Sequence, residues 1–343
     1  MIHAVSSYGP QAAGPRVRLI NWFKYLGVSP QYHEYAGLPN NRPQSLIQAA
    51  PRVIRAERKV RRLDLANAQL ILSREVSPFS RGNLEERFLK QAARGVYDFD
   101  DALFHDTSPF RRALGQQDKC RRAVSAADVV IAGNEYLANW ATAFNNDVRV
   151  IPSCVDPGSY NPKHDYSVSS SQPTLVWLGS PATEHYLAQI SGPLLQINRR
   201  TGAELVLISG AVTSEPLTQL GGMIRRIPWR LGEFADVLAG ADVAIAPLDD
   251  SPYSRGKCAF KLLQYAATGL PIVGSPVGAN ELALSRFDGL SVNIGSEWED
   301  ALLEILSETS ERRKLRGDRA LAAVREHYSF AAWHREWMGS VGL

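Results

Sequence analysis

The feature that most constrains the fold is the alternation of short β-branched runs with stretches of helical composition along the whole chain. This alternation is typical of βαβ units, in which helices join parallel strands and cover both faces of a sheet. In the first half, the predicted strands are 2–6, 70–74, 96–100, 129–132 and 148–152. In the second half, they are 174–178, 205–209, 224–227, 243–247, 271–275 and 290–294. The sequence therefore predicts an α/β protein with two doubly wound parallel sheets.

Chain length and one break in this pattern predict two domains. The chain has 343 residues, and a domain usually has about 150. Residues 156–173 are rich in Pro, Ser, Gly and Asp and lack a hydrophobic period, so we expect a linker there. The predicted domains are 1–155 and 174–325, followed by a terminal helix at 326–343. A ligand is expected between the carboxyl ends of their strands.

Composition excludes several classes of protein. The net charge of +3 is small and the cations are scattered among acids, which disfavours nucleic-acid binding. Three cysteines without C-x-x-C spacing disfavour a zinc site or a disulfide framework and suit a reducing cytoplasm. The sequence has no run of about 18 apolar residues and no apolar signal-peptide core at its start. We expect a soluble cytoplasmic protein.

Residues 254–278 combine cations with the start of an apolar helix. The helix is expected to begin near Cys258 or Ala259 and to end at Gly269, before Pro271. The cations are Arg255, Lys257 and Lys261.

Cations are unfavourable at a helix N-terminus, by about 0.3 to 1 kcal/mol each, because the helix dipole is positive there. A bound phosphate would remove this conflict and would be held by backbone and side chains together. Lys257 and Lys261 are four residues apart, so on one helix they would share a face. The alternative is that the three cations are solvated or paired with the acids at 249–250.

The same segment resembles the nucleotide-sugar-binding segment of glycosyltransferases of GT-B architecture, most closely the retaining family-four type. The form K-x-x-E-Y-x-A-x-G-x-P-V-V-x-S is matched by Lys261, Tyr265, Ala267, Gly269, Pro271, Val273 and Ser275. Two positions depart from the family. Gln264 replaces a glutamate that usually binds the donor ribose, and Gly256 stands where many members have a second glutamate. The amide of Gln264 can still hydrogen-bond a ribose hydroxyl.

The resemblance implies two Rossmann-like domains that face a central cleft. The first would bind the acceptor and the second a UDP, GDP or dTDP sugar, with the last helix crossing back to the first domain. The implied reaction moves the sugar to a hydroxyl of a glycan, a lipid-linked or a small-molecule acceptor, with retention and without a metal or other cofactor. Two alternatives remain: a sugar-nucleotide epimerase of the same fold, and a non-catalytic subunit that binds a nucleotide sugar.

The loop at 6–15 is a candidate second phosphate contact. Gly14 lets the backbone approach a ligand, and the resemblance implies a donor contact for Arg16. The alternative is that Arg16 and Arg18 only decorate a helix surface.

Polar residues at the end of the strand at 96–100 are candidates for acceptor chemistry. Asp100, Asp101 and His105 are expected to orient or deprotonate an acceptor hydroxyl. We expect no metal at these carboxylates, because the cations of 254–278 already supply charge for a diphosphate. Arg74 and Glu75 end the preceding strand and are expected to pair with each other nearby.

In the second half, Ser180 and Thr183 follow a strand and precede a helix, so they are candidate phosphate contacts. Trp229 lies where relatives bind the nucleobase, and it could stack on the base or simply pack at the rim of the core.

The segment at 52–62 is strongly basic with a narrow apolar stripe. It suits either a peripheral contact with an anionic membrane surface or an ordinary solvated helix face.

Overall fold

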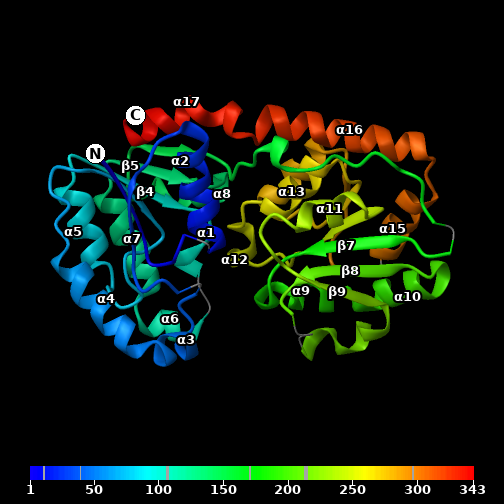
Figure 1. Ribbon diagram of the computed structural model, residues 1–343, viewed down its shortest axis with the longest axis horizontal. Coiled ribbons are helices and arrows are strands. Elements are labelled where there is room, and N and C mark those ends of the chain that lie inside the picture. The colour runs from blue at the N-terminus through cyan, green and yellow to red at the C-terminus, as the bar shows by residue number, and fades with distance from the viewer. Residues whose placement is uncertain (11, 39, 106–107, 170, 212–214, 296) are drawn as a thin grey trace. The chain divides into compact units, whose positions relative to one another are not determined.

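The computed structural model describes every residue except 11, 39, 106–107, 170, 212–214 and 296. The chain divides into two units (Figure 1). Unit 1 contains Met1–Cys154, Arg255–Cys258 and Trp333–Leu343, and unit 2 contains Val155–Ser254 and Ala259–Ala332. Each unit holds a six-stranded sheet whose neighbouring strands are all parallel. The predicted α/β fold class is confirmed.

The sheet of unit 1 has the strand order β2-β1-β3-β4-β5-β6. Its strands are β1 (Ile2–Ser6), β2 (Gln31–Glu34), β3 (Gln69–Ser73), β4 (Arg94–Phe99), β5 (Val129–Ala132) and β6 (Val148–Val150). The chain runs from β1 to one side of the sheet and then returns to the other, so the strand order reverses between β1 and β3. In open α/β sheets, ligands bind beyond the carboxyl ends of the strands at this reversal.

Helices connect and cover these strands (Figure 1). They are α1 (Ala13–Pro15), the π-helix η1 (Arg16–Ile20), α2 (Asn21–Leu26), α3 (Pro43–Gln48), α4 (Ala50–Arg62), α5 (Asn83–Gln91), the 3₁₀ helix η2 (Leu103–His105), α6 (Pro109–Ala113), α7 (Gln116–Ala126) and α8 (Glu135–Ala141). In α4, Val53, Ala56 and Val60 are buried, and this spacing of three and four residues places them on one helix face.

The sheet of unit 2 has the order β12-β11-β10-β7-β8-β9, and its reversal lies between β7 and β10. The strands are β7 (Thr174–Leu178), β8 (Glu204–Ser209), β9 (Ile224–Pro228), β10 (Val243–Ala246), β11 (Ile272–Gly274) and β12 (Leu290–Ser291). Alternate residues of β7 enter two different cores: Leu175 and Trp177 belong to one, Val176 and Leu178 to the other. Burial of both faces explains why these strands read as continuous apolar runs.

The helices of unit 2 lie on both sides of this sheet (Figure 1). They are η3 (Pro157–Ser159), η4 (Pro181–Thr183), α9 (His185–Ala188), α10 (Ser191–Thr201), η5 (Glu215–Met223), α11 (Phe234–Ala239), α13 (Phe260–Thr268), α14 (Ala279–Arg286), α15 (Glu297–Ser307) and α16 (Ser310–His327). The chain changes unit four times: after Cys154, within α12 (Pro252–Arg255), after Cys258 and within α17 (Phe330–Val341).

The terminal helix α17 contributes an aromatic anchor to unit 1. Trp337 is fully buried and stacks on Trp22 of α2, with ring centroids 5.1 Å apart and an angle of 7° between the rings. The Arg94 Nε donates to the Ser340 carbonyl at 3.0 Å. Tyr328, which directly follows α16, belongs to a core of unit 2.

All eleven predicted strands are present, and β2 was missed. Its sequence, QYHE, shows no apolar alternation because this edge strand is half-exposed. No helix in the described part of the chain is long and apolar enough to cross a membrane.

Candidate functional site

Arg74 gathers two carboxylates at the carboxyl ends of β3 and β4. Its Nε donates to the Asp100 Oδ1 at 2.7 Å, and its Nη2 donates to the Asp101 Oδ2 at 2.5 Å. The Lys257 Nζ lies 3.2 Å from the Asp101 Oδ1. We call Arg74, Asp100, Asp101 and Lys257 the Arg74 cluster. Its two cations and two carboxylates balance in charge.

The charges of the Arg74 cluster decide the protonation of Asp101. Burial by itself would raise the pKa of Asp101, but the charges of Lys257 and Arg74 outweigh it and hold that pKa below its ordinary value. The expected pair between Arg74 and Glu75 is wrong. Glu75 instead accepts from the Lys119 Nζ at 2.7 Å, because its side chain enters the buried interior of unit 1.

The segment Arg255–Cys258 packs tightly within unit 1. The Cys258 Sγ donates to the Asp100 carbonyl at 3.3 Å, and a Cβ on Gly133 would collide with that sulfur. A Cβ on Gly256 would lie 2.7 Å from the Ala102 backbone nitrogen. Position 256 therefore has no room for the glutamate that many relatives carry there.

Asn134 joins this segment to helix α8. Its Oδ1 accepts from the Leu137 N–H at 2.9 Å and so caps the N-terminus of α8. Its Nδ2 donates to the Lys257 carbonyl at 3.0 Å and to the Arg255 carbonyl at 3.4 Å. This second role could not be seen in the sequence, because the partners are more than 120 residues apart.

The loop after β1 lies against the Arg74 cluster. A Cβ on Gly14 would approach the Arg74 Nε to 3.2 Å. Arg16 is half-buried at the start of η1. Arg18, by contrast, is buried. It donates through Nε and Nη2 to Asp98 and through Nη1 to the Ile151 carbonyl, so the alternative that it decorates a helix surface is wrong.

His105 ends the short helix η2 with an exposed side chain. Its ring centroid lies 4.7 Å from that of Phe104 and 6.3 Å from that of Tyr136. Asp100 and Asp101 share the Arg74 guanidinium, whereas the His105 side chain makes only these ring contacts in the described part of the chain.

In unit 2, Tyr265 of α13 marks the reversal of strand order. Its hydroxyl accepts from the Leu178 N–H at 2.8 Å and donates to the Ile245 carbonyl at 3.4 Å. Leu178 lies in β7 and Ile245 in β10, which pair only as far as Ala244 and Val176. The tyrosine thus bridges the two strands where their own pairing ends. This gives a structural reason for the tyrosine of the sequence motif.

Lys261 lies in the first turn of α13, in unit 2. Its Nζ is 4.2 Å from the ring centroid of Trp177, and a Cβ on Gly179 would collide with the same ring. The ammonium group is therefore close to the turn that follows β7. Gln264 is buried one turn later in α13.

The other predicted donor contacts of unit 2 have local partners. The Thr183 Oγ1 accepts from the Ser180 N–H at 3.2 Å and donates to the Ser180 carbonyl at 3.0 Å, in the turn at η4. Trp229 is half-buried and stacks on Phe234 with ring centroids 6.1 Å apart. Their proposed contacts with a donor stay predictions.

One expectation about the cations is wrong. α13 begins at Phe260 after Ala259, which has a left-handed φ of 54°, so Lys257 precedes the helix and does not share a face with Lys261. Within the described residues, no group of three or more His, Cys, Asp and Glu side chains is arranged to hold a metal ion.

Two units, each with a doubly wound parallel sheet, agree with the GT-B architecture expected from the sequence. Solved structures support this assignment. HepE from Anabaena, solved with UDP and glucose, has a TM-score of 0.67 and 13% identity, and the match covers 99% of each chain. WaaG, a glycosyltransferase involved in lipopolysaccharide biosynthesis, has a TM-score of 0.66 and 11% identity over the full length of both chains. The predicted resemblance to GT-B proteins is confirmed.

Residues 172–308 match the sequence model of a family described as "Glycosyl transferases group 1". Apart from Arg255–Cys258, the matched residues lie in unit 2. TarM is also similar, with a TM-score of 0.59, 11% identity and a match to 80% of this chain. The chain spans only about half of TarM, 54% of its length. No curated protein sequence matches the chain significantly.

Proposed function

We propose that the protein transfers a sugar from a nucleoside diphosphate sugar to an acceptor hydroxyl. The match of residues 172–308 to group 1 glycosyl transferases carries this proposal, since it includes the turn after β7 and all of α13. Ligands bind open α/β sheets at the reversal of strand order, where Tyr265 bridges β7 and β10.

UDP is the nucleotide that the comparisons favour. HepE was solved with UDP and glucose, and a trehalose-phosphate synthase from Burkholderia vietnamiensis, 13% identical with a TM-score of 0.60, is described as UDP-forming. In this proposal Lys261 and the first N–H groups of α13 hold the diphosphate, and the amide of Gln264 binds a ribose hydroxyl. Ser180, Thr183 and Trp229 complete the donor site.

The proposed reaction breaks the bond between the sugar and the diphosphate and forms a bond from the sugar to the acceptor oxygen. Charge on the departing diphosphate needs stabilisation, which fixed cations supply efficiently where water is excluded. Arg255, Lys257, Lys261 and Arg16 are the proposed source of that charge, so we propose that no metal or other cofactor is required. Retention of configuration is proposed from the resemblance to family four.

The contacts of Asp101 support a positioning role for this residue. A carboxylate whose pKa is lowered is a weak base, so Asp101 is poorly suited to take the proton of the acceptor hydroxyl. It holds Lys257 instead. Asp100 and His105 are the proposed contacts of the acceptor, which is a glycan, a lipid-linked or a small molecule.

The cysteines support a location in the cytoplasm, where thiols stay reduced. Cys120, Cys154 and Cys258 are all free and buried.

Thermal-shift titration with UDP, GDP, dTDP, ADP and CMP in the presence of a chelator tests the donor site. A ligand that binds only the folded protein raises its melting temperature by mass action. We expect a shift with UDP and a smaller one for Lys261→Gln. The matched control is Lys314→Gln, since Lys314 is exposed on α16 and pairs only with Asp318 in the described structure. No shift with any nucleotide, from protein shown to be folded, would remove the proposal. Slow release of UDP from a UDP-sugar separates an enzyme from a subunit that only binds.

A further inference from the structure

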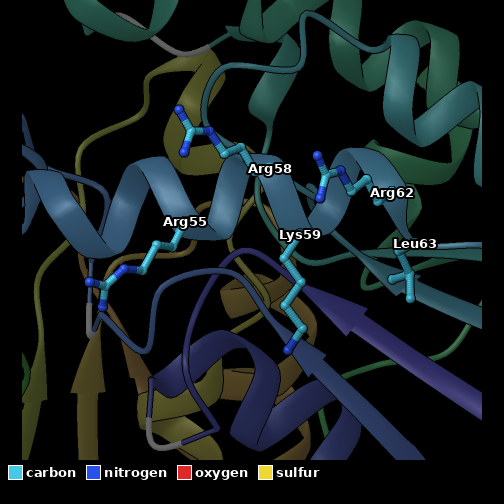
Figure 2. Close-up of a pocket in the computed structure, with 5 residues that line it drawn as sticks. All are labelled: Arg55, Arg58, Lys59, Arg62 and Leu63. Carbon is cyan, nitrogen blue, oxygen red and sulfur yellow. The ribbon is translucent and has the colours of Figure 1, made fainter.

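The exposed side of α4 forms a basic surface on unit 1. Arg55, Arg58, Lys59 and Arg62, together with Leu63, line an open hollow of about 530 Å³ (Figure 2). In this view Arg55 and Lys59 extend to one side of the helix, and Arg58 and Arg62 to the other (Figure 2). We call these four cations the α4 basic surface.

Neighbouring acids do not neutralise this surface. The only acid of α4 is Glu57, which pairs with Arg61 and accepts from the Tyr35 and Ser77 hydroxyls. The four cations make no ion pair with any carboxylate that the structure describes. Arg55 and Lys59, and likewise Arg58 and Arg62, are like charges four residues apart, which destabilises an isolated helix. The surface therefore costs stability unless an anion covers it.

Apolar side chains accompany the cations. Ile54 is 52% exposed and lies four residues before Arg58, so the two share the outer face of α4. Ile47 of the neighbouring helix α3 is 74% exposed. The opposite face of α4 is buried through Val53 and Val60, which fixes the helix to unit 1. Exposed arginines attract anionic headgroups, and an exposed isoleucine beside them adds apolar surface that can enter the headgroup boundary.

We propose that α4 docks unit 1 on an anionic lipid bilayer, with the basic surface on the phosphate headgroups and Ile54 in the headgroup boundary. An open row of cations along a helix suits a planar array of anions better than one enclosed phosphate. Nucleic acid is disfavoured because the surface has no aromatic side chain to stack on bases. This inference goes beyond glycosyl transfer and does not rest on it.

Vesicle flotation of the full chain tests the proposal. The expected result is binding to vesicles of equal parts phosphatidylcholine and phosphatidylglycerol, none to phosphatidylcholine alone, and release by raised salt. Arg58→Gln with Arg62→Gln should weaken partitioning about 30-fold, which corresponds to about 1 kcal/mol for each basic residue. Ile54→Ser should weaken it with no change of charge.

The matched control is Arg325→Gln with Arg335→Gln, two exposed arginines on α16 and α17 that have no ion pair in the described structure. Both double variants lower the net charge equally. Only a loss of vesicle binding that is confined to the α4 variant supports α4 as a specific membrane-binding surface. Equal losses in both, or equal binding to the two kinds of vesicle, would overturn the proposal. Full competition by inorganic phosphate would show a simple phosphate site instead, and binding to single-stranded RNA without binding to vesicles would show a nucleic-acid surface. UDP thermal shifts of the same variants report separately on the donor site.

Discussion

The side-chain amide of Asn134 makes hydrogen bonds through both its oxygen and its nitrogen, and the two atoms have different roles. Its oxygen caps α8, while its nitrogen holds the carbonyls of Arg255 and Lys257. Aspartate would keep the cap and lose the donor, whereas alanine would lose both.

We therefore expect Asn134→Asp to keep the cap but to weaken nucleotide binding, because the segment that carries Lys257 loses its anchor and two carbonyl oxygens then face a carboxylate. Asn134→Ala should also lose about 1 kcal/mol of stability with the cap. Urea unfolding and UDP titration measure the two effects separately. Equal UDP affinity in wild type and Asn134→Asp would contradict a role for this segment in donor binding.

Asp101 makes stability depend on pH through its lowered pKa. A lowered pKa in the folded state means that the unfolded chain binds more protons at acid pH, so this contribution is complete above the ordinary pKa of about 3.9 and is lost as the pH falls through the lowered value. Asp101→Asn should therefore flatten the loss of stability below about pH 4, measured by urea unfolding. Asp118→Asn, on the exposed surface of α7, is the control and should leave the slope nearly unchanged.

At the scale of elements, the start of α13 depends on close packing of the segment before it. Ala259 has a left-handed φ, which is unfavourable for a residue with a Cβ, and the tight contacts of Gly256 and Cys258 hold it there. Further along α13, the Tyr265 hydroxyl hydrogen-bonds to both β7 and β10.

Gly256→Ala should destabilise the protein by about 1 to 3 kcal/mol, because the new Cβ would press against the Ala102 backbone. Gly192→Ala is the matched control, since a Cβ at this position of α10 meets nothing within 4 Å. That change should be neutral or stabilise by about 0.4 to 1 kcal/mol. Chemical denaturation compares them, and equal effects would show that the contact with Ala102 is not tight.

At the scale of the whole molecule, each unit has its own cores, and unit 1 draws part of its core from the end of the chain. Trp337 fills the space against Trp22 and Phe23 of α2. A terminal helix that supplies a buried indole is a structural part of the unit and not an appendage.

Trp337→Ala should lower the stability of unit 1 by about 3 to 5 kcal/mol through loss of buried surface and the cavity that remains. Leu315→Ala, at a 42% exposed position of α16, should change stability by less than about 0.5 kcal/mol. Calorimetry would show the loss as an earlier transition of unit 1. A melting curve like that of wild type would mean that α17 adds little to the unit.

The sequence by itself determined the parallel sheets, eleven of the strands and the end of α13 at Gly269. These features rest on hydrophobic runs and on glycine, which act locally and are visible at short range. It also placed Asp100, Asp101 and Lys257 among the candidates. The edge strand β2 was not predicted, because its polar, half-exposed residues form no hydrophobic run.

Only the tertiary structure decided which charges meet. Lys257 and Asp101 are 156 residues apart, and Arg18 and Asp98 are 80 residues apart. Arg74 pairs with Asp100 and Asp101 and not with the adjacent Glu75. A long charged side chain can reach several possible partners. Which of them it pairs with depends on the strands that the fold brings together. Local sequence patterns report burial and backbone preference, whereas ion pairs depend on these long-range contacts.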